Sequence, residues 1–183
     1  MEKFRDDNLN LDFYNDFITE KESQELYDVL FKKVKWQKKS SGRHNCTYGE
    51  DGLEYIIKWY GKTTVRKAID WKELPELFPI KEKLEHITNE TYNICVIQLY
   101  PTGNVGIKPH RDKEMKFGTT ISGLSLGETR TLSMARGNKK INISLNSGSL
   151  YVFNPPTNSY WSHSIEKDIT DKPRISLTFR NYE

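Results

Sequence analysis

The chain has 183 residues, of which 36% are hydrophobic, 12% aromatic and 29% charged. This length predicts a single domain, and the composition can build a hydrophobic core, which excludes a disordered tail, a collagen and a coiled-coil rod. The 28 basic residues outnumber the 25 acidic ones, for a formal net charge of +3. So small an excess permits a nucleic-acid partner but does not argue for one, because clustering of charge on one face decides such binding.

Cysteine content and hydropathy bear on the compartment. Cys46 and Cys95 are the two cysteines, too few for a disulfide framework or a cysteine-based metal cluster. No apolar run reaches the roughly 20 residues that span a bilayer, and the first ten residues lack the apolar stretch of a secretory signal. We therefore expect a soluble intracellular protein, nuclear or cytoplasmic, that is monomeric and has no membrane partner.

The N-terminal half predicts two helices. Residues 17–36 read as the first, because Thr19 followed by Glu22 forms a capping-box pattern ahead of residues at helical spacing. Pro79 is a first-turn residue for the second helix. The apolar face of this second helix consists of Ile80, Leu84 and Ile87. The stretch 37–70 is rich in Gly and Tyr and less regular, which predicts loops or hairpins over a site.

From residue 92 onward the helical period gives way to short segments rich in Val, Ile, Tyr, Thr and Phe, separated by turn residues. The expected strands are 93–100, 119–126, 129–135, 140–145, 149–153, 160–165 and 174–180. The fold class is therefore α+β and mainly β, a sandwich or barrel that helices buttress on one side.

A candidate metal site begins with His110 and Asp112, which one residue separates. In an extended strand their side chains would point to the same side, although a surface salt bridge or a turn is an alternative. His163, in a later predicted strand, supplies a third group. Two imidazoles and one carboxylate leave three positions of an octahedral ion open, as in non-haem Fe(II) sites. His44 and His86 have no partner motif, so we expect them to be packed or surface residues.

The segment 174–180 alternates polar and apolar residues, which places Arg174 and Arg180 on one face. Either face could be the inner one. If the polar face points outward, the segment is an edge strand over an apolar core. If it points inward, the two guanidiniums need anions to pair with, and a dicarboxylate cosubstrate and Asp112 would provide them.

Four blocks, in order over roughly residues 92–181, resemble the AlkB family of Fe(II)- and 2-oxoglutarate-dependent dioxygenases. They are Gln98-Leu99-Tyr100, His110 to Glu114, Asn154 to Asn158 running into Trp161-Ser162-His163, and Arg174 to Arg180. The segment from Arg43 to Leu53 extends the similarity, which is closest to the branch that repairs double-stranded DNA. The resemblance implies one domain over 1–183. Residues 1–91 would form N-terminal helices and a nucleotide-recognition lid, and 92–183 a double-stranded β-helix (jelly-roll) core.

The resemblance also implies the roles of individual residues. His110, Asp112 and His163 would hold Fe(II) and carry the catalysis. The residues for 2-oxoglutarate would be Gln98, Tyr100, Arg174, Ser176 and Arg180, with Arg174 and Tyr100 at the distal carboxylate. The family often has Asn where this chain has Gln98 and Ser176. Both residues keep a hydrogen-bonding group, so we expect altered affinity, not loss of binding.

The implied reaction uses O2 and 2-oxoglutarate to hydroxylate an N-methyl group on a base, which then leaves as formaldehyde. The expected substrate is DNA carrying 1-methyladenine or 3-methylcytosine; an RNA demethylase, or a hydroxylase of protein or another non-nucleic-acid substrate, is the alternative. The substrate-binding residues would be Glu114, Tyr55, Tyr48, Arg43 and Trp59, with Tyr55 the preferred stacking residue. The stretch 34–42 shows no clear apolar tip to replace a flipped base, although Val34 or Trp36 could wedge a base step, so strand state stays open.

Overall fold

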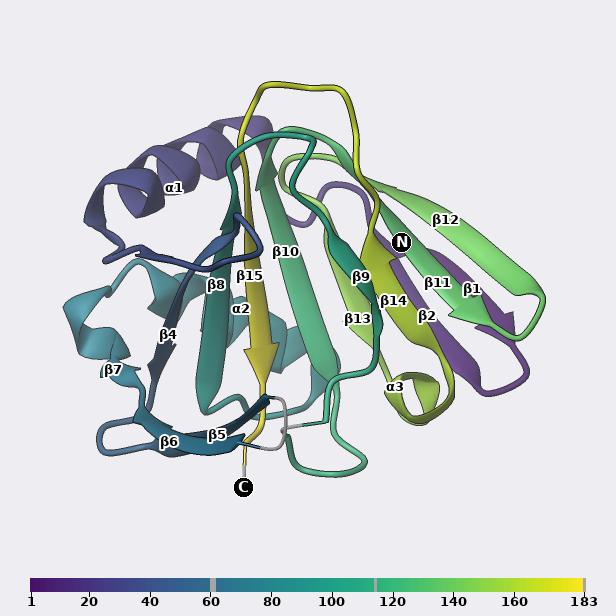
Figure 1. The fold of residues 1–183 in the computed structure, drawn as a ribbon, viewed down its shortest axis with the longest axis horizontal. Coiled ribbons are helices and arrows are strands. Elements are labelled where there is room, and N and C mark those ends of the chain that lie inside the picture. Colours follow the sequence, from purple (N-terminus) through teal and green to yellow (C-terminus); the bar gives the residue numbers. More distant parts are fainter. Residues whose placement is uncertain (60–61, 114, 183) are drawn as a thin grey trace.

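Two antiparallel sheets face each other in the computed structural model, which describes residues 1–59, 62–113 and 115–182 (Figure 1). The major sheet runs in the order β1 (Glu2–Asp6), β2 (Leu9–Tyr14), β13 (Leu150–Phe153), β10 (Ile121–Gly127), β15 (Arg174–Arg180), β8 (Ile94–Tyr100), β4 (His44–Gly49) and β3 (Gln37–Lys38), with β7 (Ile69–Asp70) parallel to β4. The minor sheet runs β12 (Lys139–Leu145), β11 (Arg130–Arg136), β14 (Ser162–Ile165) and β9 (Ile107–His110). This is the expected jelly-roll. The predicted strands are confirmed to within a few residues, except that 160–165 begins inside a short helix, α3 (Thr157–Tyr160).

Two helices cover the outer face of the major sheet, α1 (Glu20–Lys33) and α2 (Leu77–Thr88) (Figure 1). The predicted capping box starts α1: the Glu22 amide donates to Thr19 Oγ1 at 3.2 Å, and the Thr19 amide donates to Glu22 Oε2 at 2.7 Å. The helix is shorter than 17–36 because the backbone at Val34 is already extended. A single 3₁₀ turn (Trp71–Glu73) precedes α2.

The N-terminal hairpin β1–β2 was missed from the sequence, which predicted only helices and a lid before residue 92. Leu9, Leu11 and Phe13 alternate with partly exposed residues along β2, and all three are buried. Their strand pairs with β13 and so extends the major sheet. The alternation is the period-2 signal of a half-buried strand. The strand is only six residues long and its alternation is easily overlooked among the neighbouring polar residues.

The central strand β15 decides the question that its alternation left open. Ile175, Leu177 and Phe179 are fully buried against the helices, while Arg174, fully buried as well, points between the two sheets. β15 pairs with β10 on one edge and β8 on the other, and both of its faces are covered, so neither face is exposed to solvent. The polar face of β15 is therefore the inner one, and it lines the space between the sheets.

No helix in the described part of the chain is long and apolar enough to cross a membrane. Both cysteines are buried and free.

Candidate metal centre and substrate pocket

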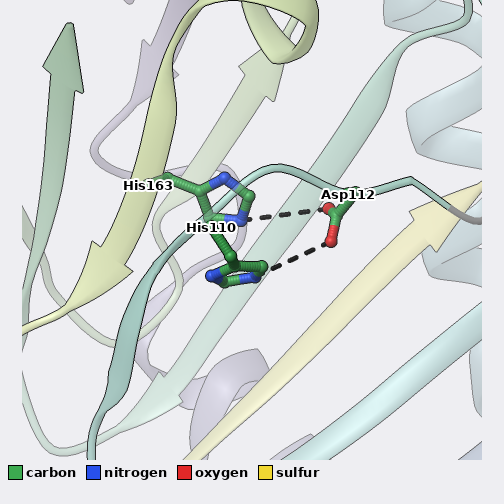
Figure 2. Close-up of side chains that lie close together, drawn as sticks. All are labelled: His110, Asp112 and His163. Atoms are coloured by element: carbon green, nitrogen blue, oxygen red, sulfur yellow. Dashed lines mark ion pairs between the residues drawn. The ribbon is translucent and has the colours of Figure 1, made fainter. Parts of the chain in front are cut away.

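Strand pairing creates the candidate metal centre. His110 ends β9 and lies directly opposite His163 of β14, so the centroids of the two imidazole rings are 4.3 Å apart. Asp112 lies in the loop just after β9, and its carboxylate oxygens are 3.7 Å from His110 Nε2 and 3.9 Å from His163 Nε2 (Figure 2). One ligand atom from each residue lies within 4.8 Å of the others. The structure thus brings the three predicted ligands together, but through a loop for Asp112 and not through alternation within a strand.

Hydrogen bonds fix the orientation of these groups. The side-chain amide of Asn158, in α3, accepts from the Asp112 amide at 3.0 Å and donates to the Asp112 carbonyl at 2.7 Å. His110 Nδ1 lies 2.9 Å from the Lys108 carbonyl oxygen. As donor in that bond, Nδ1 leaves the Nε2 lone pair free toward the centre, the usual arrangement for a metal-binding histidine.

The protonation states suit a cation. Burial alone would raise the pKa of Asp112, but Arg180, whose Nη2 lies 3.1 Å from Asp112 Oδ2, and the two histidines hold it below its usual value. Burial lowers the pKa of His163 to about 4. The carboxylate is therefore ionised and the imidazole neutral at pH 7, as metal ligands must be. Asp112 Oδ2 is buried and forms an ion pair with Arg180, and the carboxylate still offers a ligand atom within 4.8 Å of those of the two histidines.

Arg174 carries an unusual pair of unused donors. Its guanidinium is fully buried, its Nε donates to Ser125 Oγ at 2.8 Å, and it lies 5.2 Å from the centroid of the Tyr100 ring. Nη1 and Nη2 have no hydrogen-bond partner among the described residues. A buried guanidinium in this state is costly unless a ligand pairs with it, and a carboxylate fits its two donors.

A small cavity of about 30 Å³ lies between the sheets. Four of the residues predicted for the cosubstrate line it together with the two histidines: Gln98, Tyr100, Ser176, Arg180, His110 and His163. Tyr100 donates its hydroxyl to Gln98 Oε1 at 3.0 Å. The structure therefore places four of the five predicted cosubstrate residues around one space that His110 and His163 also line. The fifth, Arg174, is connected to that space through its contact with the Tyr100 ring.

A larger pocket of about 490 Å³ opens from His110 and Asp112 toward the lid. The lid is the hairpin of β5 (Glu54–Trp59) and β6 (Lys62–Lys67), a two-stranded sheet of its own. Tyr55 and Arg43 line this pocket, as predicted, and Arg66 and Tyr182 line it too.

The remaining predicted substrate residues fare differently. Tyr48 is only 2% exposed and packs in the core beneath the helices, on the opposite face of β4 from Thr47, which lines the pocket. Burial also raises its pKa. The structure therefore removes Tyr48 from the candidate stacking residues. Glu114 and the side chain of Trp59 lie outside the part of the chain that the structure describes, so their roles stay predictions.

Sequence reasoning missed Tyr151, a buried residue of β13 that also lines the small cavity. Its ring lies over Gly123, its partner on β10: a Cβ at position 123 would overlap the phenol ring. Burial raises the pKa of Tyr151 to about 12, so the phenol is neutral. A lone glycine inside a strand often marks such a close approach, and that was the available signal.

Comparisons with known proteins agree with this geometry. The model of the 2OG-Fe(II) oxygenase superfamily matches residues 10–180. The alpha-ketoglutarate-dependent dioxygenase alkB homolog 3 of Mus musculus is 28% identical over 91% of this chain and 64% of its own length. The DNA oxidative demethylase ALKBH2 of Bos taurus is 30% identical over 97% of this chain and 70% of its own. The chain thus spans about two thirds of these relatives.

Solved structures support the fold. OsALKBH1 superposes with a TM-score of 0.63 at 13% identity, covering 93% of this chain and 97% of that one. A Pseudomonas putida prolyl-4-hydroxylase gives 0.60 at 14% identity, covering 94% and 93%.

A jelly-roll that brings two histidines and an aspartate together at one point is typical of the class of mononuclear non-haem iron oxygenases. The family model and the relatives then identify the chain itself: it belongs to the 2OG-Fe(II) oxygenase superfamily and, within it, to the AlkB family. Oxygenases of this superfamily use Fe(II), 2-oxoglutarate and O2, and the donor set at the centre suits such a metal ion.

The Gly123–Tyr151 contact generates a stability prediction. Gly123→Ala should lower the free energy of unfolding by about 1–3 kcal/mol, because the new methyl group overpacks against the ring. Gly123→Ala combined with Tyr151→Leu should be at least about 1 kcal/mol more stable than the sum of the single effects, since the ring is gone. Urea unfolding measures both. Tyr151→Phe is the control: it keeps the ring and should give no rescue, and equal rescue by Phe would contradict the packing.

Proposed function

We propose that this protein is an oxidative dealkylase of nucleic acid that removes N-alkyl groups such as the methyl of 1-methyladenine and 3-methylcytosine, with DNA the favoured substrate. The observation that carries the proposal is the pocket that joins the metal centre to the lid. Its volume of about 490 Å³ can hold a base, Tyr55 lines it, and Arg43 and Arg66 add positive charge. The alkB homolog 3 and ALKBH2 relatives support the same reaction class.

Iron and cosubstrate fit the residues around the centre. His110, Asp112 and His163 would hold Fe(II), and the free Nη1 and Nη2 donors of Arg174 would bind the distal carboxylate of 2-oxoglutarate. Together with O2, the bound pair supplies an oxidation in which 2-oxoglutarate becomes succinate and CO2 while the methyl carbon gains a hydroxyl and departs as formaldehyde. Arg180 keeps Asp112 ionised, and Asn158 holds the loop that presents it.

The lid side of the pocket would bind the nucleotide. The face of Tyr55 can stack on a base, and a tyrosine ring also attracts the positive charge of 1-methyladenine and 3-methylcytosine. Arg43, which donates to Gln98 Oε1 at 3.3 Å, and the exposed Arg66 would contact phosphate groups. Glu114, if it faces the pocket, would favour the same cationic bases.

A single-stranded substrate is favoured over a duplex. The two residues that could have wedged a base step are both engaged elsewhere. Val34 is 5% exposed and buried in the core, and Trp36 packs against that core while its Nε1 donates to the Phe31 carbonyl at 3.1 Å. Neither is free to fill the gap that a flipped base leaves in a duplex.

A substrate panel tests the proposal. Purified protein with Fe(II), ascorbate and 2-oxoglutarate should convert 1-methyladenine and 3-methylcytosine in single-stranded DNA, with each product lighter by the mass of CH2, because a hydrogen replaces the methyl group. RNA and duplex DNA of the same sequence should react more slowly. Mass spectrometry of the oligonucleotide and succinate measured in the same tube give both halves of the reaction. Succinate without demethylation of any oligonucleotide would reject the dealkylase and favour a hydroxylase of protein or another substrate.

Asp112 tests the metal assignment. Asp112→Ala should lower turnover by more than about 100-fold. Loss of a residue that only hydrogen-bonds to a metal ligand costs about 10- to 100-fold, and loss of a ligand itself should cost more. Calorimetric titration with Mn(II) should show weakened binding in the same variant. Asp171→Ala changes an exposed aspartate and is the matched control. Full activity of Asp112→Ala would remove it from the metal site.

Arg174 tests the cosubstrate assignment. Arg174→Met should raise the Kd for 2-oxoglutarate by roughly 10- to 100-fold, as expected for loss of charge-assisted hydrogen bonds. Without ligand, its Tm should stay unchanged or rise, because a buried charge with unused donors is gone. Calorimetry and thermal unfolding measure the two effects.

Arg130→Met is the control for that variant. Arg130 is equally buried, but its guanidinium donates to the carbonyl oxygens of Thr102, Gly103, Val105 and Glu166. Its loss removes four hydrogen bonds to carbonyl oxygens, although those of Thr102 and Gly103 keep a backbone partner, and should cost about 3 kcal/mol or more in unfolding free energy. An Arg174→Met protein as unstable as Arg130→Met would mean that Arg174 is structural and does not bind a ligand.

A further inference from the structure

The β5–β6 hairpin forms a wall of the substrate pocket, yet it belongs to neither sheet of the jelly-roll (Figure 1). An isolated two-stranded hairpin is marginally stable in water. Its base is closed by the Ala68 amide, which donates to the Leu53 carbonyl at 2.9 Å. On the β6 side, Arg66 Nη1 donates to Gln37 Oε1 at 3.2 Å. Its place over the pocket therefore depends on side chains that reach it from the body of the protein.

Tyr182 is such a side chain on the β5 side. It lies two residues after Arg180, and its hydroxyl accepts a hydrogen bond from the Ile56 backbone amide at 2.7 Å. Its ring also meets the ring of Tyr55, with centroids 6.5 Å apart and planes at 82°. Tyr182 therefore touches both the backbone of the hairpin and the aromatic residue that the hairpin presents to the pocket.

The backbone of Tyr182 is itself fixed. Its amide donates to Asn93 Oδ1 at 2.7 Å, and Asn93 Nδ2 donates to its carbonyl at 2.7 Å. The amide of Asn93 in turn donates to the Arg180 carbonyl at 3.2 Å. Since Asn93 precedes β8 and Arg180 ends β15, Tyr182 is tied to the two strands that carry much of the small cavity.

We propose that Tyr182 positions the lid and determines which substrates fit, a role that rests on the proposed function. The hydroxyl holds β5 in place, and the ring forms a corner of the pocket with Tyr55, because both residues line it at nearly perpendicular planes. A flat base that stacks on one ring meets the other ring with its edge. The corner favours a planar aromatic group and aligns it with the metal centre. Tyr182 has this role although it is neither a candidate metal ligand nor a cosubstrate residue.

Two variants of the full chain separate hydroxyl from ring. Tyr182→Phe removes the bond to Ile56 and keeps the ring, so the KM for single-stranded DNA with 1-methyladenine should rise about 2- to 10-fold, the equivalent of one hydrogen bond. Tyr182→Ala removes both and should raise it by more than tenfold. Hydrogen exchange at the Ile56 amide should accelerate in both variants. The KM for 2-oxoglutarate should stay unchanged. Tyr160→Ala, at an exposed tyrosine of α3, is the matched control.

The outcomes distinguish the two proposals. Binding is measured independently of turnover, by fluorescence anisotropy with the same labelled oligonucleotide. Wild-type binding that both variants retain, or a KM for 2-oxoglutarate that rises in parallel with that for DNA, would overturn the role of Tyr182 alone. If the wild-type chain neither binds nor demethylates any oligonucleotide, the proposed function fails, and this inference fails with it.

Discussion

The pairing of β9 with β14 is the constraint on which the site depends. It sets His110 opposite His163, and the register shifts between His163 and Ile165. Because side chains alternate across a strand, a slip of one residue would turn one imidazole to the other face of the minor sheet. The position of Asp112 does not depend on strand register, because the Asn158 side chain binds both its amide and its carbonyl and so holds it near the histidines. The β9–β14 pairing thus positions the two candidate histidine ligands, and the side-chain amide of Asn158 positions Asp112.

Two buried arginines show how this interior separates structure from ligand binding. Nη1 and Nη2 of Arg130 donate to backbone carbonyls and so hold the chain between β8 and β9 in place. Arg174, on the other sheet, lies near the same Tyr100 ring, but its Nη1 and Nη2 have no hydrogen-bond partner among the described residues. The two side chains are equally buried but differ in how many of their donors are hydrogen-bonded. A purely structural role explains Arg130 and not Arg174, since an unpaired buried charge is unfavourable. The difference supports the proposal that Arg174 binds an anion that the chain does not supply.

The sequence could predict what local pattern and spacing encode. The capping box at Thr19, the strands after residue 92 and the three candidate metal ligands were all readable. It could not predict which face of a strand points where when both faces are covered: Tyr48 and Thr47 differ by one residue and lie on opposite sides of β4. Nor could it place Tyr151 or Tyr182, whose roles depend on what lies across from them, a glycine on β10 and the edge of β5.

The position of the lid explains how substrate choice can vary independently of the chemistry. Except for Asp112, the candidate metal and cosubstrate residues lie on strands that are hydrogen-bonded into the two sheets, so their geometry is shared with the whole core. The β5–β6 hairpin stands apart from both sheets and is held by contacts such as those from Tyr182 and Gln37. A change at one of these contacts moves the wall of the pocket without disturbing the ladder that aligns the histidines. We therefore expect selectivity to be set by a few side chains at the edge of the core, where substitution is least costly to stability.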